Sequence, residues 1–135
     1  MNNKLKYIML VDDNPDDNFF HEREIKKNNS ETIVVTKSTG MEALEYLKSP
    51  QDSRANPDLI FLDINMPGMN GWEFLKEYNL LDKQLQSKAV IIMLTTSDNP
   101  DDQARAKTWD FVSDYITKPL TKEIMNGIIH KYFIG

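Results

Sequence analysis

Short apolar runs alternate along the chain with longer segments in which apolar and polar positions are mixed. The runs contain little polar alternation and are rich in β-branched and other large apolar residues. Runs of this kind are typical of strands that are buried on both faces of a parallel sheet. The pattern predicts five strands, at residues 7–11, 33–35, 58–62, 90–94 and 115–117.

The segment after the first strand predicts a helix at residues 16–27, because the proline that precedes it suits the first turn of a helix. Its apolar periodicity is loose, and we interpret Phe19, Phe20 and Ile25 as the side chains that anchor it to the core. Charged residues make up most of the remainder. We therefore expect the single histidine of this helix, His21, to lie on a solvated face.

Four further segments predict helices. The second helix begins near Thr39, which stands three residues before a glutamate in the spacing of a capping box. The third begins near Gly71. Either Ser97 or Asn99 caps the fourth, and Thr121 caps the last, whose apolar side chains repeat at i, i+4 spacing.

Five successive strand–helix units predict a parallel sheet with helices on both faces. The expected fold is a doubly wound α/β domain of the flavodoxin-like kind, with five helices and the strand order 2-1-3-4-5. With 135 residues, the chain is long enough for one core and too short for two. We expect residues 1–135 to form a single domain.

Composition and charge exclude several classes of function. The chain has no cysteine, so it can form neither a disulfide nor a thiolate metal site, which fits a reducing cytoplasm. A net charge of −5 argues against a nucleic-acid partner. The apolar stretch before Asp12 is too short for a signal peptide or a membrane span. We expect a cytoplasmic protein that binds neither nucleic acid nor membrane.

Polar side chains follow four of the predicted strands at the point where each strand ends. In an open parallel sheet these carboxyl ends meet at one edge, where ligands bind. Three carboxylates, two hydroxyls and an ammonium should therefore lie close together. They belong to Asp12 and Asp13 after the first strand, Asp63 after the third, Thr95 and Thr96 at the fourth and Lys118 after the fifth.

Three carboxylates at one edge repel each other, by roughly 4 kcal/mol per pair at 4 Å and an effective dielectric of 20. A divalent cation would offset this repulsion, and an oxygen-only ligand set indicates Mg²⁺. A threonine hydroxyl and a lysine ammonium can bind phosphate oxygens on the other side. The arrangement predicts that Asp63 is a carboxylate nucleophile that accepts a phosphoryl group.

These residues, in this order, resemble the receiver domain of two-component response regulators. The similar stretches are Val11-Asp12-Asp13, residues 57–67 with Gly71, Leu94-Thr95-Thr96, and residues 115–119. The similarity covers essentially the whole chain. It implies one receiver domain with no output domain, similar to the small stand-alone receivers of chemotaxis and of bacterial phytochromes.

The resemblance implies a signalling switch in a His-to-Asp phosphorelay. The phosphoryl group would come from a sensor histidine kinase or a histidine phosphotransfer protein, and Asp63 would be the phosphoacceptor. The implied Mg²⁺ ligands are Asp12, Asp13, Asp63 and the backbone carbonyl of Asn65. Such a protein is not an enzyme with a separate substrate, although it catalyses its own phosphoryl uptake and autodephosphorylation.

The resemblance also implies roles for residues around the acids. Thr95 and Lys118 would contact the phosphoryl group. Tyr115 would change rotamer together with Thr95 as the switch. Asn65 and Ser97 would border the path of the water that removes the phosphoryl group, and so set its lifetime.

One departure from the family pattern precedes Tyr115. Many receivers carry Gly-Ala there, whereas this chain carries Phe111-Val112. The change falls on the face formed by the fourth helix, the fifth strand and the last helix. The resemblance implies that a downstream protein binds to this face.

Two other functions remain open from the residues alone. Phosphatases of the haloacid dehalogenase family also combine an aspartate nucleophile, Thr or Ser, Lys and Mg²⁺. Their nucleophile, however, ends the first strand in an Asp-x-Asp motif, whereas Asp63 follows the third strand and has Asn65 two residues later. A phosphate-independent adaptor is disfavoured by the complete set of acids.

Overall fold

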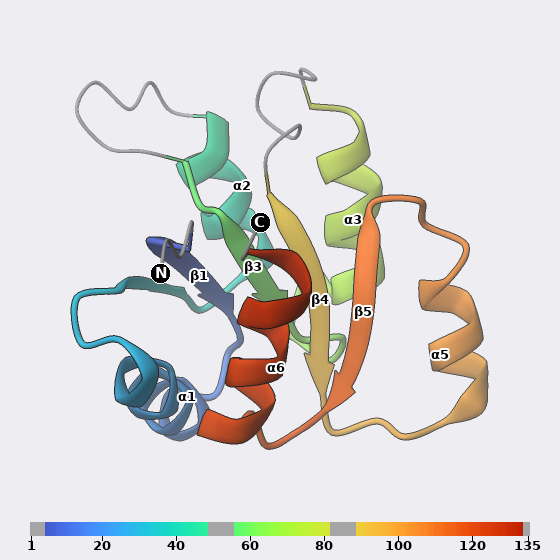
Figure 1. The fold of residues 1–135 in the computed structure, drawn as a ribbon. Coiled ribbons are helices and arrows are strands. Elements are labelled where there is room, and N and C mark those ends of the chain that lie inside the picture. Colours follow the sequence, from blue (N-terminus) through green and yellow to red (C-terminus); the bar gives the residue numbers. More distant parts are fainter. Residues whose placement is uncertain (1–4, 49–55, 82–88, 134–135) are drawn as a thin grey trace.

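A computed structural model describes residues 5–48, 56–81 and 89–133. In this part of the chain, five parallel strands form one sheet in the order β2-β1-β3-β4-β5 (Figure 1). The predicted fold class and strand order are confirmed. The strands are β1 (Tyr7–Val11), β2 (Ile33–Lys37), β3 (Leu59–Leu62), β4 (Val90–Thr95) and β5 (Val112–Thr117).

The three central strands lie close to their predicted positions, because each is an unbroken apolar run. Every residue of β1 and β3 is buried. β5 begins at Val112, three residues earlier than predicted, and its early positions include the polar Ser113 and Asp114. Its pairing with β4 is irregular between Ile91 and Ile92. An edge strand with exposed polar positions lacks the apolar run by which the other strands are recognised.

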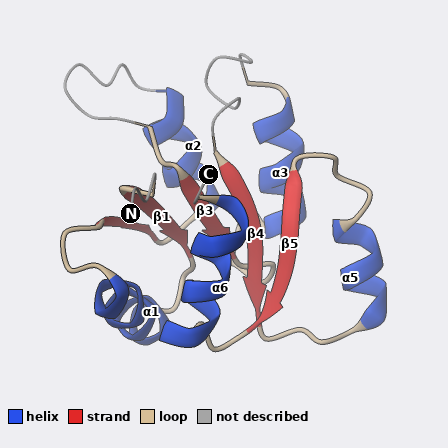
Figure 2. Ribbon diagram, in the orientation of Figure 1, coloured by secondary structure: helices blue, strands red, loops and turns tan. Residues whose placement is uncertain are grey.

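Five helices pack on the sheet in the described residues (Figures 1 and 2). Two cover one face and three the other, and each layer buries its own apolar cluster against the sheet. None of the helices in this part of the chain is long and apolar enough to span a membrane. The helices are α1 (Pro15–Asn28) and α6 (Lys122–Tyr132) on one face, and α2 (Gly40–Lys48), α3 (Gly71–Asn79) and α5 (Pro100–Ala106) on the other.

Side-chain caps fix where several helices begin. Asn70 and Glu73 form a reciprocal capping box at the start of α3. Thr121 caps α6 as predicted, by accepting a hydrogen bond from the backbone of the third helical residue. Of the two candidates for α5, Asn99 is the cap. Ser97 instead donates its hydroxyl to Asp102, at 2.6 Å.

The inward face of α1 differs from the prediction. Phe19 is 67% exposed and Phe20 is 40% exposed, so only Ile25 of the three predicted anchors is buried. The prediction failed because polar residues occupy the inward positions. The amide of Asn18 donates to the backbone carbonyl of Asp12, and the carboxylate of Glu24 accepts from the backbone N–H of Lys122. The buried polar residues of α1 are Asn18, His21 and Glu24.

Candidate functional site

Hydrogen bonds that continue the sheet beyond the strand ends align the site residues. The backbone N–H of Asp63 donates to the carbonyl of Val11 at 3.0 Å, which places Asp63 beside Asp12. In the same way, the N–H of Lys118 donates to the carbonyl of Thr95 at 2.8 Å. The edge of the sheet therefore brings together the residues that the strand-end pattern predicts.

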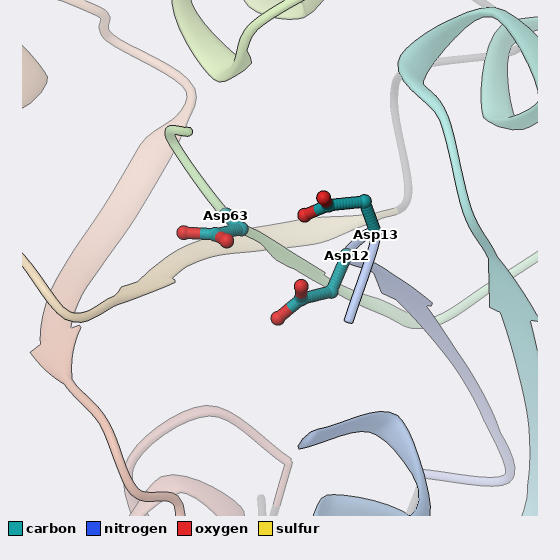
Figure 3. Close-up of side chains that lie close together, drawn as sticks. All are labelled: Asp12, Asp13 and Asp63. Atoms are coloured by element: carbon teal, nitrogen blue, oxygen red, sulfur yellow. The ribbon is translucent and has the colours of Figure 1, made fainter. Parts of the chain in front are cut away.

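The three carboxylates form one cluster at the carboxyl ends of β1 and β3 (Figure 3). One oxygen atom from each of Asp12, Asp13 and Asp63 lies within 4.8 Å of the others. Asp12 and Asp63 are buried, whereas Asp13 is exposed. At this separation each pair repels by roughly 3 to 4 kcal/mol for an effective dielectric of 20. A set of hard oxygen donors this close together fits a Mg²⁺ ion.

Asp63 lies in a buried, partly neutralised environment. One of its carboxylate oxygens accepts a hydrogen bond from the backbone N–H of Ile64 at 2.8 Å. Burial raises the pKa of Asp63, and the charge of Asp12 raises it further. Lys118, a hydrogen bond from Thr95 and the bond from Ile64 act in the opposite direction without cancelling the rise. Asp63 is therefore a more basic carboxylate than an exposed aspartate.

Lys118 is the cation of the site, and its side chain is 9% exposed. Its Nζ lies 2.6 Å from Asp12, 2.8 Å from Asp17 and 3.5 Å from Asp63. Burial alone would lower the pKa of Lys118, but the hydrogen bonds to Asp12 and Asp17 and the charge of Asp63 raise it overall. The ammonium stays protonated at neutral pH. The peptide bond between Lys118 and Pro119 is cis.

The contact with Asp17 was missed from the sequence. Acidic residues in the first turn of a helix are favoured by the helix dipole alone, so Asp17 carries no separate signal there. Its contact with Lys118 depends on how α1 packs beside α6, which local pattern does not reveal.

Asn18 and His21 are buried side chains of α1 that lie beside Asp12 and Asp63, and the sequence did not reveal this position either. The side-chain amide of Asn18 donates to the backbone carbonyl of Asp12 at 2.9 Å. His21 is 2% exposed, so the expectation of a solvated histidine was wrong. Burial lowers the pKa of His21, and the nearby charge of Lys118 lowers it further. His21 is therefore a neutral side chain beneath the carboxylates.

A chain of contacts leads from Thr95 toward β5. Thr95 is fully buried, and its hydroxyl accepts a hydrogen bond from the backbone N–H of Ser97 at 3.3 Å. The hydroxyl of Tyr115 donates to the backbone carbonyl of Ser97 at 2.8 Å. The predicted switch pair, Thr95 and Tyr115, is thus joined through Ser97. Asn65 lies exposed in the segment between β3 and α3.

Gly71 allows that segment to fold tightly behind Asp63. Its backbone N–H donates to the carbonyl of Ile64 at 2.8 Å. A Cβ at this position would lie 2.5 Å from the carbonyl oxygen of Asp63 and 2.9 Å from the Cα of Ile64. Only glycine permits so close an approach to backbone.

A family model for the response regulator receiver domain matches residues 8–130. The chain therefore belongs to the response regulator receiver family. Receivers of this family are signalling switches of two-component systems rather than enzymes in the usual sense. They interact with histidine kinases or phosphotransfer proteins and with downstream partners.

Relatives and solved structures support the assignment along most of the chain. A two-component response regulator from Cytophaga hutchinsonii is 30% identical with a TM-score of 0.85, over 95% of this chain and 96% of that one. The phosphorylated cyanobacterial phytochrome response regulator RcpA is 32% identical with a TM-score of 0.75, over 94% and 90%. The protein PilH of Pseudomonas aeruginosa is 26% identical over 95% of this chain and 98% of its own length. The chain spans about half the length of some curated relatives, such as 55% of the Escherichia coli regulator NarL and 50% of the DctR regulator of Halalkalibacterium halodurans.

Proposed function

We propose that this protein is a phosphoacceptor switch in a His-to-Asp phosphorelay, and that Asp63 carries the phosphoryl group. The observation that supports this most directly is a buried carboxylate at the end of a central strand, hydrogen-bonded to Thr95 and close to the ammonium of Lys118. In the forward step, an Asp63 oxygen attacks the phosphorus of a phosphohistidine on the donor protein. The new O–P bond replaces the N–P bond, and the released imidazole takes a proton from solvent.

The acidic cluster supports Mg²⁺ as the cofactor. Asp12, Asp13 and Asp63 would hold the ion together with the backbone carbonyl of Asn65. A bound Mg²⁺ would supply positive charge for the oxygens of the phosphoryl group. Lys118 supplies a second positive charge from the protein itself.

Autodephosphorylation would reverse the state of the switch. A water attacks the phosphorus, the bond between phosphorus and the Asp63 oxygen breaks, and inorganic phosphate leaves. Asn65 and Ser97 would flank the approach of this water. Neither is bulky or cationic, so we expect that they do not suppress hydrolysis strongly.

The partner face we propose is formed by α5, β5 and α6. A surface groove between α5 and β5 includes Gln103, Lys107 and Tyr115 among its lining residues. Because Tyr115 is also bonded to the segment after Thr95, a rearrangement at the phosphoryl site would change this groove. Phe111, at the departure from the family pattern, directly precedes β5 and packs its ring against those of Tyr78 and Trp109.

We also propose that residues 1–135 form a single receiver domain. The family match over residues 8–130 supports this.

Incubation with acetyl phosphate tests the function without a known kinase. Wild type should gain one phosphoryl group in a Mg²⁺-dependent reaction, and Asp63→Asn should gain none. Asp16→Asn, which removes an exposed carboxylate of α1, should behave as wild type. Sustained turnover of p-nitrophenyl phosphate would instead indicate a phosphatase and contradict the proposal.

A further inference from the structure

The ammonium of Lys118 is shared among three acceptors. An ammonium has three N–H donors, and the ion pairs of Lys118 within the described residues involve three carboxylates, those of Asp12, Asp17 and Asp63. All three donors are therefore committed. A phosphoryl group on Asp63 takes the place of that carboxylate as acceptor. The ammonium, 3.5 Å from Asp63, can bind the phosphoryl oxygens closely only by moving away from Asp12 or Asp17.

The two close partners, Asp12 and Asp17, differ in how readily they can be released. The side chain of Asp12 is 7% exposed, so a loss of Lys118 would leave a buried carboxylate without its cation. The side chain of Asp17 is 35% exposed. Water can therefore replace the ammonium at Asp17 with a small loss of free energy.

We infer that Asp17 is a positioning residue that holds Lys118 in the resting protein and releases it when Asp63 carries a phosphoryl group. This inference rests on the proposed function. In the resting state Asp17 draws the ammonium to 2.8 Å, while Asp63 remains 3.5 Å from it. Asp17 thus competes with the phosphoryl group for the same cation and opposes the active state.

The affinity for beryllofluoride with Mg²⁺, a mimic of the phosphoryl group, tests this competition at equilibrium. Asp17→Asn removes the competing charge and should tighten beryllofluoride binding about two- to fivefold, the range of a partly exposed ion pair. Asp16→Asn is the matched control, because it removes the same charge from the adjacent, exposed position of the first turn of α1. It should change the affinity much less.

A double-mutant cycle separates a contact with Lys118 from a general effect of charge. In a Lys118→Ala background, Asp17→Asn should no longer tighten beryllofluoride binding. Equal effects of Asp17→Asn and Asp16→Asn, a persisting effect without Lys118, or weaker binding by Asp17→Asn would each overturn the inference.

The resting contact can be tested without any phosphoryl mimic. The ¹⁵N resonance of the Lys118 ammonium should shift in Asp17→Asn and not in Asp16→Asn. An unchanged resonance would overturn the inference even if Asp63 is phosphorylated. A shifted resonance in a protein that takes up no phosphoryl group would contradict the proposed function while leaving the contact established.

Discussion

Replacing Gly71 with alanine is expected to destabilise the protein and to displace the phosphoacceptor. The added Cβ would lie 2.5 Å from the carbonyl oxygen of Asp63 and 2.9 Å from the Cα of Ile64. Both atoms belong to backbone, so no side chain can rotate away to make room. The segment that carries Asp63 must move relative to the start of α3, which would also strain the 2.8 Å hydrogen bond from Gly71 to Ile64.

Overpacking of this kind typically destabilises a protein by about 1 to 3 kcal/mol. The higher helix propensity of alanine offsets up to about 1 kcal/mol of that loss. Two other glycines provide matched controls. A Cβ at Gly127, in α6, meets nothing within 4 Å, so Gly127→Ala should stabilise the protein by up to about 1 kcal/mol. A Cβ at Gly40 would meet the side chain of Met69, whose sulfur lies 2.9 Å away and can move, so Gly40→Ala should be nearly neutral.

Urea unfolding of the three variants, followed by circular dichroism, measures these free energies. Acetyl phosphate labelling of the same samples measures the effect on Asp63, and Gly71→Ala should be labelled more slowly than the other two. A Gly71→Ala variant as stable as Gly127→Ala and labelled at the wild-type rate would refute the reasoning about the close approach.

Three further predictions concern the charges and the lifetime. Burial and the charge of Asp12 raise the pKa of folded Asp63, so its stabilising contribution is present at acidic pH and is lost as pH rises through that pKa. In thermal melts with EDTA, Asp63→Asn should therefore gain stability over wild type toward neutral pH. A gain independent of pH would contradict this. Lys118→Ala should bind Mg²⁺ more tightly, because three carboxylates lose their cation, and it should take up phosphoryl groups more slowly. Calorimetry measures the Mg²⁺ affinity. An unchanged affinity would show that the ammonium does not offset the repulsion between the carboxylates. Ser97→Arg should slow the decay of the phosphorylated protein by crowding the attacking water. Each tenfold change in the decay rate corresponds to about 1.4 kcal/mol of activation free energy. Equal decay rates in Ser97→Arg and wild type would show that Ser97 does not border the path of the water.

The strands and the capped helices were predictable because local sequence determines them. β1 and β3 are continuous apolar runs, and Thr121 and Asn99 cap helices through contacts within a few residues. The packing of α1 was not predictable in this way. Its inward face is polar, and the two phenylalanines that local pattern favours as anchors lie in solvent.

The candidate site likewise contains residues whose positions follow from local sequence and residues whose positions depend on helix packing. Asp12, Asp63 and Lys118 each follow a strand, and the carboxyl ends of parallel strands meet by geometry, so their proximity follows from order along the chain. Asp17 and His21 enter the site from a helix, and their contacts depend on how that helix packs beside α6. A buried histidine among charged neighbours has no distinguishing local pattern, which is why His21 was assigned to solvent.

The position of the phosphoryl group is the most direct test of the proposed switch. Protein phosphorylated with acetyl phosphate and Mg²⁺ would be reduced with borohydride, which converts an aspartyl phosphate to homoserine, and then mapped by peptide mass spectrometry. We expect modification at Asp63 and at neither Asp12 nor Asp13. Modification at Asp12 or Asp13, or uptake that persists in Asp63→Asn, would contradict it.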